Sequence, residues 1–124
     1  MEGSPKHRAN RRRGEIEAAI GGRTRVLCLT LGGLAELETA FGADNLNDLA
    51  ARFATGRLKS TDIIRIIGAG LRGGGNLVSD DDVGAMEIEG GLAGAARIVT
   101  ALLTATFAPE GENTQVGEAG APSP

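Results

Sequence analysis

The sequence has few of the residues on which catalytic sites and nucleic-acid platforms are usually built. It contains no Trp or Tyr, three Phe, one Cys and one His among 124 residues. With so few aromatic rings, a single-stranded nucleic acid has no platform on which to stack its bases. One cysteine cannot form an internal disulfide, a usage that fits a reducing cytoplasm. A Ser-His-Asp triad or a Cys-His pair would need His7, which lies in a charged N-terminal segment outside the predicted folded body.

Long hydrophobic runs are also missing. No apolar stretch reaches the ~18 to 20 residues that cross a bilayer, and the charged N-terminus lacks the apolar region of a secretory signal. We therefore expect no membrane association. Hydrophobic residues make up 41% of the chain, which is enough for a globular core. The length suggests one domain.

Charge divides the chain into three parts. Residues 1–13 carry five basic residues and one acidic residue, and residues 108–124 carry three acidic residues and three prolines. Both segments hold too little apolar surface to offset the entropy of ordering, so we predict a disordered basic arm and a disordered acidic Pro/Gly tail. The predicted folded body, residues 14–107, has a net charge of −4. An acidic body argues against a dedicated nucleic-acid binder. The remaining nucleic-acid alternative is a small regulator that binds through the basic residues from Lys6 to Arg13.

The body opens with a hairpin signal. Glu15 to Ile20 alternates between polar and apolar residues, Gly21-Gly22 follows, and Arg23 to Leu29 is rich in Thr, Val and Leu. If the loop includes Arg23, one face carries Ile16, Ala18, Ile20, Val26 and Cys28. In that register the cysteine is a small buried hydrophobe.

Capping residues and apolar stripes predict about five short helices after the hairpin. The first predicted helix runs from Leu31 to Phe41 after Thr30, and the second begins after Asn45 and is ended by Gly56. The others run from Asp62 to Leu71 after Ser60 or Thr61, from Ser79 to about Glu87, and from Leu92 to Phe107. In the last helix, an arc of Ala95, Ile98, Val99, Leu102, Leu103 and Phe107 lies opposite Arg97 and Thr104. The expected fold is mainly α with an N-terminal β-hairpin (α+β), in one small domain.

Two motifs resemble a dinucleotide-binding site and a metal site, but helix ends explain both. Gly68-Ala69-Gly70-Leu71-Arg72-Gly73 matches the dinucleotide fingerprint, but that motif needs a helix to begin at its third glycine. Gly74, Gly75 and Asn76 cannot begin one, so we interpret the run as a glycine-rich helix end. Asp80, Asp81 and Asp82 would diverge by ~100° per residue on a helix, which prevents convergence on one cation. We expect no metal, no cofactor and no enzymatic activity.

Three blocks resemble a known family. They are ANRRRGEIEAAIGG (residues 9–22), LCLTLGGLAELETAFGADNL (residues 27–46) and RFATGRLKSTDIIRIIGAGLRGGG (residues 52–75). They closely resemble the small gene transfer agent family, which is encoded in phage-like tail clusters of alphaproteobacteria. That family is grouped with phage tail assembly chaperones and has also been labelled a tail tube protein. The resemblance covers about residues 9 to 107 and brings no catalytic residues with it.

The resemblance implies a non-enzymatic tail assembly chaperone of a prophage-derived particle, working in the bacterial cytoplasm. Such chaperones keep the tape measure protein soluble while tail tube proteins polymerise around it. We place the contact on two predicted helices, with Leu34, Leu37, Phe41, Ile63 and Ile67 as anchors, although all five could equally be core residues. The alternative is a structural subunit of the tail tube. The two predicted strands are few for the β-rich inner wall of such a tube, and the sequence leaves homo-oligomer formation open.

Overall fold

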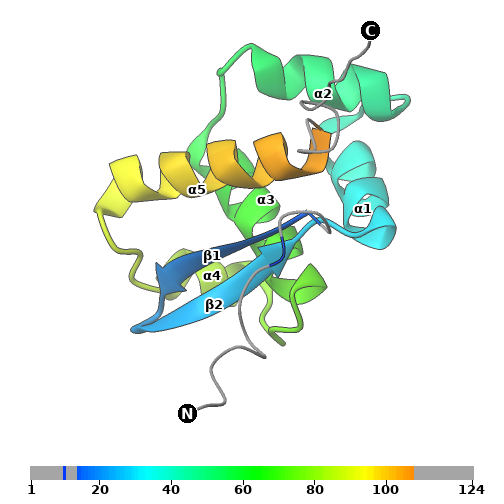
Figure 1. Cartoon of the computed structure of the whole chain (residues 1–124). Helices are drawn as coiled ribbons and strands as arrows, with labels where there is room; N and C mark the ends of the chain where they lie inside the picture. The colour runs from blue at the N-terminus through cyan, green and yellow to red at the C-terminus, as the bar shows by residue number, and fades with distance from the viewer. Residues whose placement is uncertain (1–9, 11–13, 108–124) are drawn as a thin grey trace, which may run out of the picture.

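The computed structural model describes Asn10 and residues 14–107. The predictions for the basic arm and the acidic tail, including His7, therefore lie outside the described residues apart from Asn10. The described chain forms β1 (Glu15–Ile20), β2 (Arg23–Cys28), α1 (Leu31–Phe41), α2 (Leu46–Ala54), α3 (Ser60–Gly73), α4 (Asp80–Ala85) and α5 (Gly91–Phe107). This confirms a mainly α fold with an N-terminal β-hairpin (Figure 1).

The hairpin register differs from the predicted one. Gly21 and Gly22 form a two-residue turn in which both have positive φ, 66° and 85°, so Arg23 belongs to β2 and pairs with Ile20. Two positive φ angles define the turn type that matches the twist of a tight hairpin, and glycine adopts them without strain. Ile16 consequently lies opposite Leu27. The buried residues of the two strands are Ile16, Ile20 and Leu27.

The shorter turn also changes the environment of the cysteine. Because side chains alternate along a strand, a register shift of one residue exchanges the two faces. Leu27 takes the fully buried position, while Val26 and Cys28 are only half-buried. The prediction that Cys28 is a core residue on the Ile16 face was therefore wrong.

Helix α3 lies at the centre of the molecule and contacts β2, α1, α4 and α5 (Figure 1). Its residues from Ile66 to Leu71 are all buried. Glycines in the C-terminal half of α3 allow α5 and β2 to approach the helix closely. A Cβ atom on Gly70 would lie 2.6 Å from Leu102 Cδ2, and one on Gly73 would overlap the carbonyl oxygen of Cys28. The fingerprint-like glycines thus serve helix packing, and the segment before them is helix rather than strand, as predicted.

Local capping fixes most helix starts where the sequence predicts them. Thr30 Oγ1 accepts from the Gly33 N–H (3.0 Å), Asn45 Oδ1 from the Asp48 N–H (2.8 Å), and Ser79 Oγ from the Asp82 N–H (3.0 Å). Helix α3 is the exception. It begins at Ser60 rather than Asp62, because Asp62 Oδ2 accepts from the Lys59 N–H (2.9 Å) and Lys59 is the cap. Helix α4 ends at Ala85, two residues before the predicted Glu87.

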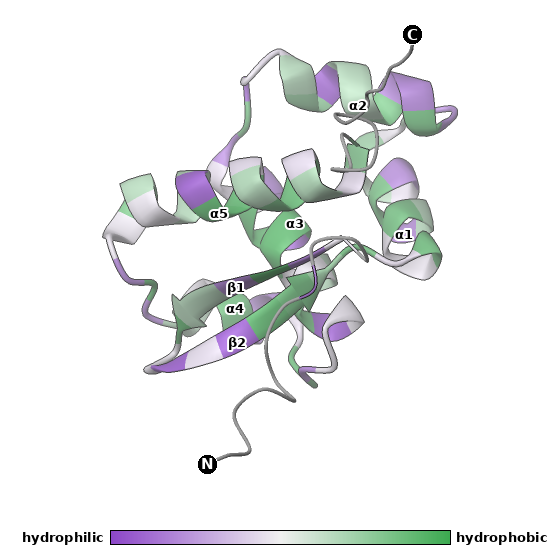
Figure 2. Cartoon of the chain, in the orientation of Figure 1, coloured by the Kyte–Doolittle hydropathy of each residue, from purple (hydrophilic) through white to green (hydrophobic). Residues whose placement is uncertain are grey.

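The remaining helices complete the core around α3. Helix α5 packs on β1 and β2 through the predicted arc, with Ala95, Val99 and Leu102 buried and Arg97 exposed. Helices α1 and α2 contact each other, and the rings of Phe41 and Phe53 meet edge to face at 5.6 Å. Figure 2 shows hydrophobic residues along α3 at the centre of the fold, while α2 carries several hydrophilic ones.

Candidate functional site

The five predicted anchors do not form one exposed surface. Leu34, Leu37 and Ile67 are buried in the core, with exposed fractions of 7%, 1% and 0%. Phe41 and Ile63 are half-buried and pack against that core. The structure separates the set by location: Ile63 and Ile67 lie on α3, and the other three lie on α1. Their binding role stays a prediction, and only the α3 pair borders a cleft.

That cleft is an apolar groove between α3, α4 and α5, which we call the α3–α4–α5 groove. It has a volume of about 230 Å³ and is lined by Ser60, Ile63, Ile64, Ile67, Val83, Gly84, Met86, Ile88, Gly91, Leu92 and Ala95. Ile63 and Ile64 are half-buried, and Leu92 is 73% exposed at the start of α5. The exposed leucine and the half-buried isoleucines leave apolar surface in water at this groove.

Most of the groove lining was not predicted as part of a site. Val83, Met86 and Ile88 come from α4 and the segment after it, so their contact with α3 depends on tertiary packing. Leu92 had a local signal. It lies three residues before Ala95, and thus extends the apolar arc of α5 by one step at helical spacing. Its exposure shows that the arc continues beyond the core.

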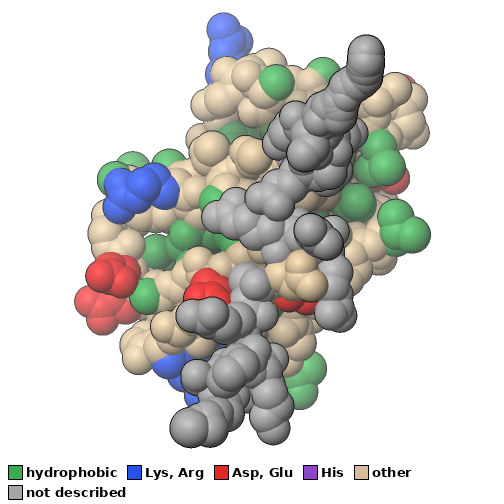
Figure 3. Space-filling model, viewed as in Figure 1, with side chains coloured by type: hydrophobic (Ala, Val, Ile, Leu, Met, Phe, Trp, Pro, Cys, Tyr) green, Lys and Arg blue, Asp and Glu red, His purple; other side chains and the backbone are tan. Residues whose placement is uncertain are grey.

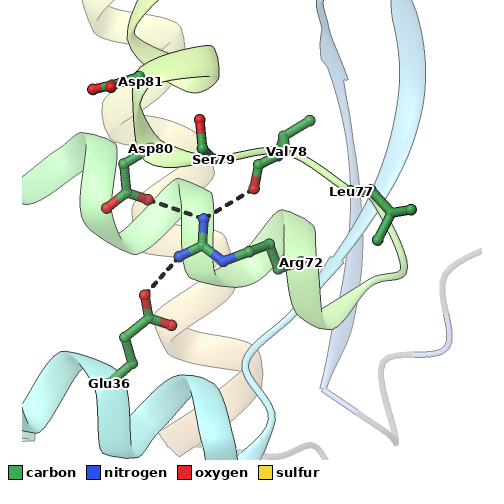
Figure 4. A pocket seen from close by; sticks show the side chains of 7 residues that line it. All are labelled: Glu36, Arg72, Leu77, Val78, Ser79, Asp80 and Asp81. Atoms are coloured by element: carbon green, nitrogen blue, oxygen red, sulfur yellow. Dashed lines mark hydrogen bonds and ion pairs between the residues drawn. The ribbon is translucent and has the colours of Figure 1, made fainter.

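A second hollow surrounds Arg72 (Figure 4). The guanidinium donates to Glu36 Oε2 on α1 (2.7 Å), to Asp80 Oδ1 on α4 (3.1 Å) and to the carbonyl oxygen of Val78 (3.1 Å). Leu77, 97% exposed, points away from this cluster. With its terminal nitrogens bound to three acceptors, Arg72 serves as a link between α1, α3 and α4. One positive charge thus faces two carboxylates, and these contacts join three helices.

The charge on the surface is unevenly distributed. Residues 60–96, which supply every lining residue of the groove, contain six acidic and two basic residues. The other residues of 14–107 contain six of each, so the net charge of −4 lies entirely within the groove-forming segment. Figure 3 shows acidic side chains grouped at the end of the molecule where the segment between α4 and α5 lies (compare Figure 1). The exposed residues of that segment include Glu87 and Glu89.

The described residues contain neither a metal-ligand cluster nor a membrane-spanning helix. Among residues 10 and 14–107, no three His, Cys, Asp or Glu side chains are grouped so that they could hold a metal ion. No helix in that part of the chain is long and apolar enough to span a bilayer. The aspartates after Ser79 have the predicted role, since Asp82 Oδ2 accepts from the Ser79 N–H (2.9 Å) at the start of α4.

Comparison with protein families decides the identity. A family model described as "Phage tail tube protein, GTA-gp10" matches residues 13–109, which is most of the chain. The chain belongs to this family. The resemblance to a gene transfer agent protein is thereby confirmed, and the family description names the tail tube rather than a chaperone. A search of curated proteins and a search of solved structures each found no match.

Proposed function

We propose that this protein of the GTA-gp10 family helps to build the tail of a phage-like particle by contacting other tail proteins, without a catalytic step. The observation that carries the proposal is the α3–α4–α5 groove, an open apolar surface in a chain whose family is named for a tail component. The work of such a protein is done by apolar and electrostatic contacts. Assembly in the bacterial cytoplasm, with tail proteins as partners, follows from this role.

The first specific role is a structural subunit of the tail tube. The family description supports this reading over the chaperone role, which reverses the order expected from the sequence. A tube subunit must present two complementary surfaces, because stacking into a ring or tube requires head-to-tail contacts between identical chains. In this role the groove would contact a different tail protein, apart from the head-to-tail surfaces between subunits.

The second role is a tail assembly chaperone that binds the tape measure protein and leaves before the particle matures. The fold favours it for one reason. The described residues contain a single two-stranded sheet, whose strands have six residues each, and a β-rich inner wall would need more. In this role the groove would hold an apolar segment of the partner.

Light scattering coupled to size-exclusion chromatography separates the two roles. The purified chain is run over a range of concentrations with refractive-index detection, because the absence of Trp and Tyr leaves little ultraviolet signal. Rings or tubes that grow with concentration support the tube subunit. A monomer or small oligomer that also keeps coexpressed tape measure protein soluble supports the chaperone. A small species that binds neither tape measure nor tail tube protein contradicts the whole proposal.

A further inference from the structure

No charged residue lines the α3–α4–α5 groove itself, so a charge preference for a partner must come from acidic residues of the segment that forms its walls. From residue 73 to residue 96 the chain contains five acidic residues and no Lys, Arg or His. Asp80 is paired with Arg72, and Asp82 caps α4. The other three, Asp81, Glu87 and Glu89, are exposed, and none forms an ion pair within the described part of the chain.

Basic residues near these carboxylates balance their charge only partly. Arg65 lies in a neighbouring hollow with Asp80 and Asp81, Arg23 lies in another with Glu87 and Glu89, and Arg97 lies in a third with Glu89. None of the three arginines comes within 4.0 Å of these carboxylates. Residues 60–96 carry an excess of four negative charges. Such a surface attracts a positively charged partner over about 8 Å at physiological salt.

The walls of the groove favour a helix over an extended strand. Side chains from three helices and the α4–α5 segment line it. A strand gains affinity by pairing with an open sheet edge, whereas a helix satisfies its own backbone and inserts only side chains. A volume of about 230 Å³ equals roughly seven or eight liquid water molecules. That volume accommodates side chains and excludes a helix backbone, whose cylinder is about 10 Å wide with side chains.

We propose that the α3–α4–α5 groove docks an amphipathic helix from a partner tail protein, with an apolar stripe in the groove and Lys or Arg flanking it. This inference rests on the proposed function and names the partner chemistry of the same site. The chain's own residues 1–13 supply basic charge but, apart from Met1, no large apolar anchor. Residues 14–107 of a second copy carry a net charge of −4, so a second copy is a poorer occupant than a heterologous basic helix.

Two synthetic peptides test the proposal by calorimetric titration against the full chain. Both are about 18 residues long, or about 27 Å as a helix. Both carry leucines at i, i+3, i+4 and i+7 spacing, one with flanking lysines and the other with flanking glutamates. We expect the lysine peptide to bind at least about tenfold more tightly at about 0.05 M salt, with a smaller ratio at about 0.5 M. Equal affinities, or no binding of either peptide, would overturn the proposal.

Matched variants locate the binding. Leu92→Asn removes an apolar side chain at the rim of the groove without adding charge and should weaken the lysine peptide at least about tenfold. Leu77→Asn makes the same change on an exposed leucine outside the groove and should leave affinity unchanged. The double variant Glu87→Gln/Glu89→Gln should reduce the preference for the lysine peptide. If Leu92→Asn binds as wild type does, the groove is not the docking site.

The same variants distinguish this inference from the proposed function. If wild type and Leu92→Asn both bind a tail protein, yet the peptides show no charge preference, the function stands and the groove inference fails. If the lysine peptide binds and no tail protein does, the groove chemistry stands and the proposed function fails. Self-association that is lost in Leu92→Asn would identify a second copy as the occupant and overturn the heterologous helix.

Discussion

The two halves of α3 have different packing within one helix. From Ile66 to Leu71 every residue is buried, and the glycines of the run bring α5 and β2 close to the helix axis. From Ser60 to Arg65 the residues are exposed or half-buried, and Ile63 and Ile64 border the α3–α4–α5 groove. Small residues allow close packing that fixes the fold, whereas large apolar residues without complete cover leave a surface for a partner. The same helix thus combines a tightly packed half with a half that borders the groove.

The largest effect on stability is expected when the two isoleucines predicted as anchors are each replaced by alanine. Ile67→Ala should lower the free energy of unfolding by about 2 to 5 kcal/mol, because it leaves a cavity at a fully buried position. Ile63→Ala should cost clearly less, since that side chain is half-exposed. Urea unfolding followed by circular dichroism measures both values. Equal losses would show that the two halves of α3 do not differ as described.

The next largest effect on stability is expected at a glycine of α3 that packs closely against β2. Gly73→Ala should destabilise by about 1 to 3 kcal/mol, because the added Cβ meets the backbone carbonyl of Cys28 and a backbone atom cannot swing aside. Gly32→Ala is the matched control in α1, where the nearest atom would be Thr30 Oγ1 at 3.8 Å. It should be neutral or stabilise by up to about 1 kcal/mol, because alanine is the better helix former. A tolerated Gly73→Ala would refute close approach as the role of these glycines.

A smaller effect is expected where α3 ends at the Arg72 link. Arg72→Met keeps much of the aliphatic stem and removes the contacts to Glu36 and Asp80. Both pairs are partly exposed, so we expect a loss of about 1 kcal/mol, decreasing at high salt. Arg65→Met removes a similar charge that forms no ion pair within residues 14–107 and should change stability by less than about 0.5 kcal/mol. Identical effects of the two substitutions would mean that the link contributes nothing.

The smallest effect on stability belongs to the groove rim. Leu92→Ser should change the free energy of unfolding by less than about 0.5 kcal/mol, because the side chain is 73% exposed. Thermal unfolding of this variant and of wild type gives the comparison. A loss above about 2 kcal/mol would place Leu92 in the core and remove the main argument for an open groove.

Local signals predicted much of the fold. Thr30, Asn45 and Ser79 cap their helices as expected, since a cap depends on a side chain and an amide two or three residues away. The hairpin register was not predictable in the same way. A loop with or without Arg23 fits the local pattern equally well, and burial of Leu27 against α3 and α5 decides between them.

The candidate site was less predictable than the fold. The periodicity that marks Ile63 and Ile67 as apolar is the same for a core residue and for a contact residue. Ile67 lies at full burial and Ile63 at the groove, a difference set by how α4 and α5 pack on α3. Val83 and Ile88 join them from another part of the chain. Besides Leu92 at the start of the α5 arc, the excess of acidic residues from 73 to 96 could have marked this side of the molecule from the sequence.

Hydrogen–deuterium exchange of the chain, alone and bound to tail proteins of its own gene cluster, tests the central claim most directly. The account predicts that residues 60–65 and 83–95 gain protection on binding, because they form the open walls of the groove. Residues 66–74 should be protected already and change little, since they are packed in the core and approach β2 and α5 closely. Protection that appears elsewhere, with the groove-forming segments unchanged, would contradict the division of α3 into a structural half and a contact half.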